Sequence, residues 1–213
     1  MPDDKDITVE HIPGLPEALP DGERILWQGR PKVMALAQEA LSLNWILGYF
    51  ALLIVWRVGV STPLMPFGAA LLTAIPFLIL GAVAAAILIL IAYVQARATV
   101  YTITTERVAM RVGAALTLTL NLPFPKIAAA DLDLKKSGTG TIALRTLGQA
   151  RLSYMVLWPH IRPWHLKLTQ PALRCIPEAA KVAAILAEAA ETRVSRPEIT
   201  IRDTTPTGAV AAE

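Results

Sequence analysis

The sequence predicts an integral membrane protein in which a hairpin of two transmembrane helices precedes a small α+β domain. The first observation is that residues 58–96, a stretch of 39, contain no Asp, Glu, Lys or Arg. Roughly 20 apolar residues are enough to cross the hydrocarbon core of a bilayer. The second observation is that the chain after Arg97 alternates between apolar and polar residues, as half-buried strands do, and then ends in an amphipathic helix.

The composition supports this division. Of the 213 residues, 54% are hydrophobic and 17% are charged, and the mean hydropathy is +0.48. Residues 97–191 carry twelve Lys or Arg against six Asp or Glu, and this excess favours contact with anionic lipid headgroups or an acidic partner surface. Nucleic acid is not an expected partner, because the sequence shows no basic helix with base-reading side chains.

Residues 1–39 are predicted to form a cytoplasmic N-terminal tail, extended over residues 1–20. The opening MPDDKD lacks the basic region and early apolar run of a signal peptide, so the hydrophobic helices are expected to act as their own insertion signals. Residues 21–32 contain a short apolar run that ends at Trp27. This run is predicted to be either a short strand or an anchor at the membrane boundary.

The transmembrane hairpin is predicted at residues 40–96. Its first helix is expected at about 40–60, a length of about 31 Å, and its second at about 67–94. The linker at 61–66 contains two prolines. The second helix is longer than one straight crossing needs, so either Pro76 kinks it or its first turns lie in the membrane interface. A third span is rejected because two crossings do not fit into the 28 residues of that second segment.

Lys and Arg flank the hairpin at both of its outer ends, whereas the short loop has only Arg57 at its edge. The positive-inside rule therefore predicts a multi-pass protein with both termini in the cytoplasm. Small residues on the second helix would allow close packing against a partner helix or a second copy of the chain. They are Gly68, Ala69, Ala70, Gly81, Ala82, Ala84, Ala85 and Ala86.

A folded domain is predicted at residues 97–192, followed by a disordered tail at 193–213. About seven strands are expected, in segments 99–110 (with a turn at 104–107), 116–122, 127–134, 141–144, 150–157 and 164–168. Residues 177–191 have a proline at their start and one apolar face, which predicts a helix. Short strands followed by one amphipathic helix are typical of a small β-sandwich or barrel whose open end the helix closes.

The motif YTITTERVAMRVG at residues 101–113 resembles the opening of bacterial pleckstrin-homology-like (PH-like) domains, which follow membrane hairpins in many small bacterial proteins. Lys126 and Ile127 after a pair of prolines, and GTGTIAL at 138–144, match later parts of the same pattern. The resemblance implies a bent β-sandwich or barrel of about seven strands, capped by a C-terminal helix.

A more specific resemblance covers most of the chain. The phrase GLPEALPDGERILWQGRPK at residues 14–32, followed by a hairpin and this domain, resembles the PuhB family of photosynthetic-complex assembly proteins in purple bacteria. It implies a non-enzymatic assembly factor for the photosynthetic reaction centre and core light-harvesting complex, in the bacterial inner (intracytoplasmic) membrane. The implied partners are reaction-centre and core-antenna subunits or other assembly factors, the lipid bilayer, and a second copy in a homo-oligomer. The alternative is a membrane-anchored PH-like binding module unrelated to photosynthesis.

Candidate residues for chemistry are few. His160 and His165 in WPHIRPWH are candidate ligands for a metal or for the magnesium of a bacteriochlorophyll, but no Cys or carboxylate cluster accompanies them, so a proline-rich loop with surface histidines is favoured. Cys175, the single cysteine, is expected to be a structural thiol. Asp131 and Asp133 are expected to lie on a solvated strand face. No Walker loop, GxSxG or HExxH motif occurs, so we expect no enzyme activity, no cofactor and no bound metal.

Six residues are candidates for contact with a partner or with lipid. In the pleckstrin fold, basic residues in turns can hold phosphoinositide headgroups, but ordinary surface charge near an anionic leaflet is the favoured interpretation here. The six candidates are Trp27, Arg107, Arg111, Lys135, Lys136 and Trp164.

Overall fold

The structure is a computed structural model that describes residues 19–20, 22–113, 117–135, 137–148, 153–165 and 169–195. Several predictions lie outside these residues: most of the extended tail at 1–20, nearly all of the disordered tail at 193–213, residues 150–152 and 166–168 of two predicted strands, and Lys136.

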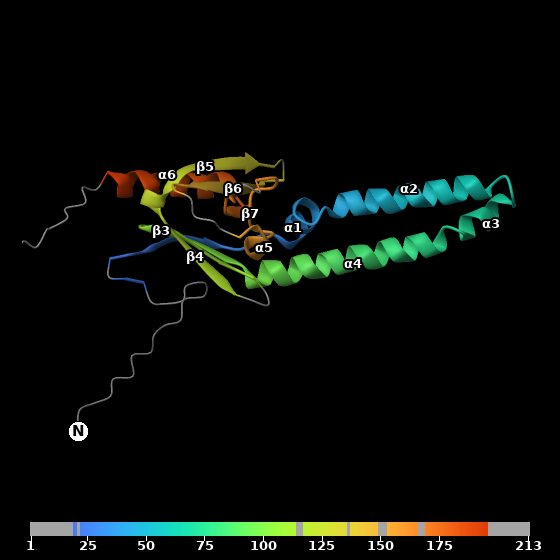
Figure 1. Cartoon of the computed structure of the whole chain (residues 1–213), viewed down its shortest axis with the longest axis horizontal. Helices are drawn as coiled ribbons and strands as arrows, with labels where there is room; N and C mark the ends of the chain where they lie inside the picture. The colour runs from blue at the N-terminus through green and yellow to red at the C-terminus, as the bar shows by residue number, and fades with distance from the viewer. Residues whose placement is uncertain are drawn as a thin grey trace, which may run out of the picture.

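The hairpin is built from four helices: α1 (Val33–Glu39), α2 (Leu43–Ser61), α3 (Phe67–Leu72) and α4 (Ile75–Ala98). Helices α2 and α4 lie side by side and project away from the strands (Figure 1). Leu43–Ser61 and the stretch Phe67–Ala98 are long and apolar enough to cross a membrane, and only 6% of the apolar window in each is buried inside the protein. The helix breaks at Thr73 and Ala74, between α3 and α4, and Pro76 is the second residue of α4. Proline has no N–H for a hydrogen bond to the preceding turn, so it is tolerated at the start of a helix but interrupts one that would continue through it.

The strands form two antiparallel sheets. The first contains β1 (Ile25–Gly29), β2 (Val100–Thr104), β3 (Arg107–Val112) and β4 (Leu118–Pro123) in that order, and the second contains β5 (Ile127–Leu134), β6 (Thr139–Thr146) and β7 (Ala172–Pro177). A short helix, η1 (Phe124–Lys126), connects the two sheets. The core lies between the sheets and helix α6 (Ala179–Val194). The described residues thus form seven strands and a C-terminal helix, as the resemblance implied, although the strands do not all lie in the predicted segments.

The first sheet corrects the boundary of the predicted tail. Residues 25–29 form β1, which pairs with β2, and Gly29 lies opposite Tyr101. Of the two alternatives for this run, the strand is therefore correct and the anchor at the membrane boundary is wrong. Trp27 is half-buried and packs against the core of the strand domain.

Two of the predicted strands are wrong as well. Tyr154–Leu157 is a short helix, α5, and Trp164 and His165 lie in a turn and the segment after it. The last strand is instead β7, Ala172–Pro177, which contains the buried charged residue Arg174. All of its residues except Pro177 are buried, so it lacks the alternation that marks a half-buried strand in sequence.

Candidate functional site

The base of the hairpin is packed directly against the strand domain, and we call this contact the joint. Leu36 and Ala37 of α1 form a buried cluster with Ala92 and Ala96 of α4 and with Cys175 of β7. The backbone N–H of Lys32 donates a hydrogen bond of 2.9 Å to the carbonyl of Cys175. The joint therefore fixes the hairpin relative to the domain through both apolar contacts and backbone hydrogen bonds.

A continuous chain of hydrogen bonds crosses the joint. The hydroxyl of Thr99, directly after α4, donates to the carbonyl of Gln95 at 2.8 Å. Thr99 Oγ1 is 2.9 Å from Nε2 of His160, and the Tyr101 hydroxyl is 2.6 Å from Nδ1 of the same ring. The Tyr101 oxygen also accepts the backbone N–H of Arg174.

These contacts assign the tautomer of His160. Because the Thr99 hydrogen is used on Gln95, Thr99 Oγ1 accepts from Nε2–H, and Nδ1 accepts from the Tyr101 hydroxyl. Burial lowers the pKa of His160 to about 4, and the charge of Arg174 adds to the effect. The ring is therefore neutral at pH 7, and burial likewise raises the pKa of the Tyr101 hydroxyl.

The prediction of surface histidines is wrong for His160, which is fully buried. Both of its ring nitrogens are engaged, so neither has a lone pair free for a metal or for the magnesium of a pigment. His165 lies apart from this network and bonds to the carbonyl of Pro163 at 2.9 Å. Within the described residues no cluster of three or more His, Cys, Asp or Glu could hold a metal ion.

Arg174 connects the domain to the end of α1. Its guanidinium donates to the carbonyl of Pro159 and to the carbonyl of Glu39, each at 3.2 Å. The second bond satisfies one of the carbonyls that the last turn of a helix leaves without an intrahelical partner. A buried arginine in a strand is thus explained by the helix end that it holds.

Cys175 follows Arg174 and faces the joint. Burial, together with the negative charge of Glu39, raises the pKa of its thiol to about 12. A thiol that remains protonated at neutral pH is a poor nucleophile, so the expected structural role agrees with its environment.

A cleft of about 480 Å³ opens beside the joint, between the end of α1, β5, β6 and the segment that follows α5. Two of its acidic side chains, Asp131 and Asp133, are paired with basic ones. Asp131 binds Arg162 at 2.7 Å and Arg145 at 3.3 Å, and the hydrogen bond from Arg162 holds the pKa of Asp131 below its ordinary value. Lys135 binds Asp133 at 2.8 Å, and this bond raises the pKa of Lys135. The predicted acidic strand face is thus exposed but ion-paired.

A second hollow, of about 340 Å³, lies between the edge strand β5 and helix α6. It is lined almost entirely by apolar side chains, among them Phe124, Ile127, Ala183 and Leu186. Among the described residues that line it, Glu191 alone has an acid–base side chain.

The structure separates the six candidate contact residues. Arg111 lies opposite Val100, two residues beyond α4, and Lys135 lines the charged cleft, so both are near the hairpin. Trp164 is 92% exposed. Trp27 packs against the core, as described above, and Lys136 is outside the described residues.

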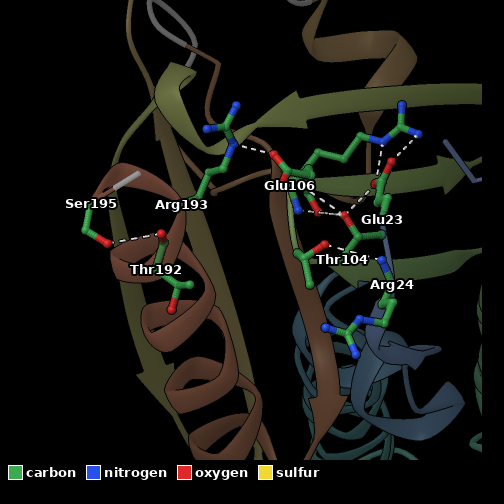
Figure 2. Close-up of polar contacts among 9 residues, drawn as sticks. Glu23, Arg24, Thr104, Glu106, Thr192, Arg193 and Ser195 are labelled. Carbon is green, nitrogen blue, oxygen red and sulfur yellow. Dashed lines mark hydrogen bonds and ion pairs between the residues drawn. The ribbon is translucent and has the colours of Figure 1, made fainter. Parts of the chain in front are cut away.

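Arg107 lies at the end of the domain remote from the hairpin. Its guanidinium binds both carboxylate oxygens of Glu23, at 2.9 and 3.1 Å, and the Thr104 hydroxyl donates to the same carboxylate at 2.6 Å. Figure 2 shows this cluster beside the ion pair between Arg193 of α6 and Glu106. Arg107 thus holds the segment before β1 in place.

Comparison with known proteins assigns the family. Residues 42–190 match the family described as the bacterial PH domain. The chain belongs to this family. The match begins at α2 and continues into α6, so it covers the hairpin as well as most of the strands of this bacterial PH protein.

A relative extends the similarity to almost the whole chain. This bacterial PH protein is 43% identical over 198 residues to a Rhodobacter capsulatus protein described as an uncharacterized 23.7 kDa protein in the puhA 5′ region, with 92% of each chain covered. That match confirms the resemblance to PuhB-type proteins. No solved structure matches the chain.

Proposed function

We propose that this protein is a non-enzymatic membrane assembly factor for the photosynthetic reaction centre and its core light-harvesting complex. The observation that carries the proposal is the 43% identity, over 92% of the chain, to a protein of the puhA region. The resemblance of residues 14–32 to the PuhB family is a second observation, and both observations support a link to photosynthesis.

The hairpin supports a place in the inner membrane, with both termini in the cytoplasm. Large apolar side chains on the outside of α2 and α4, such as Leu52, Val55, Leu78 and Leu80, are exposed on the protein surface. Such a surface suits lipid or the helices of a membrane partner. The distribution of Lys and Arg around the hairpin supports the orientation.

The environments of the reactive side chains support a role in binding rather than catalysis. The thiol of Cys175 is protonated and buried, the nitrogens of His160 are both engaged, and Asp131 is ion-paired. Contacts with reaction-centre and core-antenna subunits would then come from the outer faces of the hairpin and the cytoplasmic domain.

Deletion of the gene tests this function. We expect lower absorbance from the reaction centre and the core antenna in membranes of the deletion strain, restored by the full-length chain from a plasmid. Normal levels of both complexes would contradict the proposal and favour a binding module unrelated to photosynthesis.

Two further measurements address the partners and the orientation. Purification in mild detergent is expected to recover reaction-centre or core-antenna subunits or other assembly factors, and an absorbance scan would detect bound pigment. A reporter that is active only in the periplasm, fused after Glu213, should be inactive. An active reporter would overturn the cytoplasmic placement of the C-terminus.

A further inference from the structure

The segment around α5 carries large apolar side chains that point out of the protein. In residues 153–165, which we call the α5 loop, Met155 is 85% exposed and Trp164 is 92% exposed, and Val156 and Trp158 are exposed as well. Apolar side chains gathered on one short segment mark a contact surface more often than isolated ones do.

The inner side of the α5 loop is firmly held. Leu157 and Ile161 are buried in the core of the strand domain. The backbone N–H of Arg162 donates to the carbonyl of Gln170 at 2.9 Å, and the side chain of His160 bonds to Thr99 and Tyr101. The outward apolar side chains are therefore displayed on a fixed backbone.

The same contacts place the α5 loop at the foot of the hairpin. Thr99, which His160 contacts at 2.9 Å, directly follows the last residue of α4. Arg174 bridges the carbonyl of Pro159 to the carbonyl of Glu39, near the start of α2. In Figure 1, α5 lies beside the end of α4 and close to α1.

The surroundings of the α5 loop fit the boundary between lipid and water. In the last turns of α4 the guanidinium of Arg97 lies over the ring of Tyr93, 5.3 Å from its centroid. An aromatic ring beside a basic residue at a helix end is typical of the headgroup level. Arg111, opposite Val100, adds a second base near the same level, and both cations complement anionic headgroups.

We propose that the α5 loop inserts Met155, Val156, Trp158 and Trp164 into the interfacial layer of the bilayer, as a third membrane contact beside the two helices. This inference rests on the proposed insertion of the hairpin. Its occupant is the lipid surface, because α5 lies beside the end of the apolar helix α4 (Figure 1) and tryptophan favours the interface. The contact would restrict tilting of the PH-like domain relative to the membrane.

Depth-dependent quenching of tryptophan fluorescence tests the inference. Full-length variants that keep one of the five tryptophans, with Phe at the other four, are reconstituted into vesicles of phosphatidylcholine and phosphatidylglycerol. The phosphatidylcholine carries bromine near the top of its acyl chains. We expect Trp158 and Trp164 to lose emission to an extent similar to Trp45 at the start of α2, and Trp27 to keep its emission.

The tryptophans of α2 separate the two proposals. Quenching of Trp45 and Trp56 without quenching of Trp158 and Trp164 would leave the hairpin inserted and overturn the lipid contact of the α5 loop. If Trp158 and Trp164 were not quenched by the lipid and became shielded from water only in complexes purified with other proteins, the result would overturn the lipid contact and indicate a protein partner in its place. Absence of quenching at all four would contradict the insertion of the hairpin and the loop contact together.

A second measurement does not depend on removing tryptophans. Met155→Cys introduces an exposed thiol for an environment-sensitive fluorophore, while Cys175 is buried and should not react. Leu147→Cys is the matched control, because Leu147 is exposed and its backbone N–H donates to the carbonyl of Lys126, the last residue of η1. A blue shift in vesicles at position 155 but not at 147 is expected, and equal emission at both positions would contradict the inference.

Discussion

His160 is the residue on which the hydrogen bonds of the joint converge. It connects the end of α4 through Thr99 to β2 through Tyr101, and both partners are buried. A neutral ring with one donor and one acceptor satisfies both contacts, whereas a protonated ring would have two donors and no acceptor. The joint therefore depends on the protonation state of one side chain.

We predict that the joint loses stability in acid. The pKa of His160 is about 4 in the folded protein and 6.5 in its reference state, so the unfolded chain binds the proton more readily. The stabilisation is complete above pH 6.5 and is lost as the pH falls toward 4, a loss of about 3 kcal/mol. Thermal unfolding in detergent at several pH values measures it.

The matched variants are His160→Gln and His165→Gln. The first should lower stability at pH 7 and flatten the dependence between pH 6.5 and 4, whereas the second should retain that dependence. An unchanged profile in His160→Gln would show that another group is responsible.

Glu23 has an equally specific role at the opposite end of the domain. Its side chain is only 4% exposed and receives hydrogen bonds from Arg107 and Thr104. Glu23→Ala leaves these donors without their acceptor, and we expect a loss of about 2 kcal/mol in the free energy of unfolding.

The control for Glu23 is Glu178→Ala. Glu178 pairs with Lys181, and both side chains are largely exposed, so a change below about 1 kcal/mol is expected. Chemical denaturation compares the two variants, and equal losses would contradict the role assigned to Glu23.

At the scale of elements, the small residues of the second helix differ in exposure. Gly81 and Ala70 are buried within the hairpin itself, Ala84 and Ala85 are half-buried, and Gly68, Ala69, Ala82 and Ala86 are exposed. A Cβ at Gly81 would lie 3.1 Å from Cβ and Cγ of Phe50 on α2. The close approach of α2 and α4 thus leaves little room for a side chain at this position, and the exposed group remains available to a partner.

Gly81→Leu is predicted to separate α2 from α4. The added side chain overpacks the contact with Phe50, at a cost of about 1–3 kcal/mol. Gly48→Leu is the control, because a Cβ at Gly48 meets nothing within 4 Å. The melting temperature in detergent should fall for Gly81→Leu and not for Gly48→Leu, and an equal response would contradict this packing.

At the scale of the whole molecule, the chain crosses between the hairpin and the strand domain more than once. Strand β1 comes before the hairpin, yet it pairs with β2, which comes after it. Both ends of the hairpin therefore continue into paired strands of the same sheet. A movement of the helices would be transmitted to that sheet through β1 and β2.

Truncation tests this closure. Removing residues 1–18 leaves every contact among the described residues in place and should not change stability. Removing residues 1–30 also deletes β1, Glu23 and the packing of Trp27, and we expect a loss of more than about 3 kcal/mol. Limited proteolysis and thermal unfolding measure the difference, and equal stability of the two truncations would contradict the role of β1.

The sequence by itself determined the elements whose signal is local. Long apolar segments predicted the two long helices, Pro76 predicted a kink where the structure has a break before α4, and alternating residues predicted β4 and β5. Hydropathy and periodicity are properties of consecutive residues, so these features can be read without knowing what lies beside them.

Only the tertiary structure decided the rest. The burial of His160 depends on Thr99, 61 residues away, and the pairing of Arg107 depends on Glu23, 84 residues away. Strand β7 contains a buried arginine because the end of α1 provides an acceptor, and β1 becomes a strand because β2 offers it a free edge. Each of these outcomes is set by a partner distant in sequence, and no local pattern records that partner.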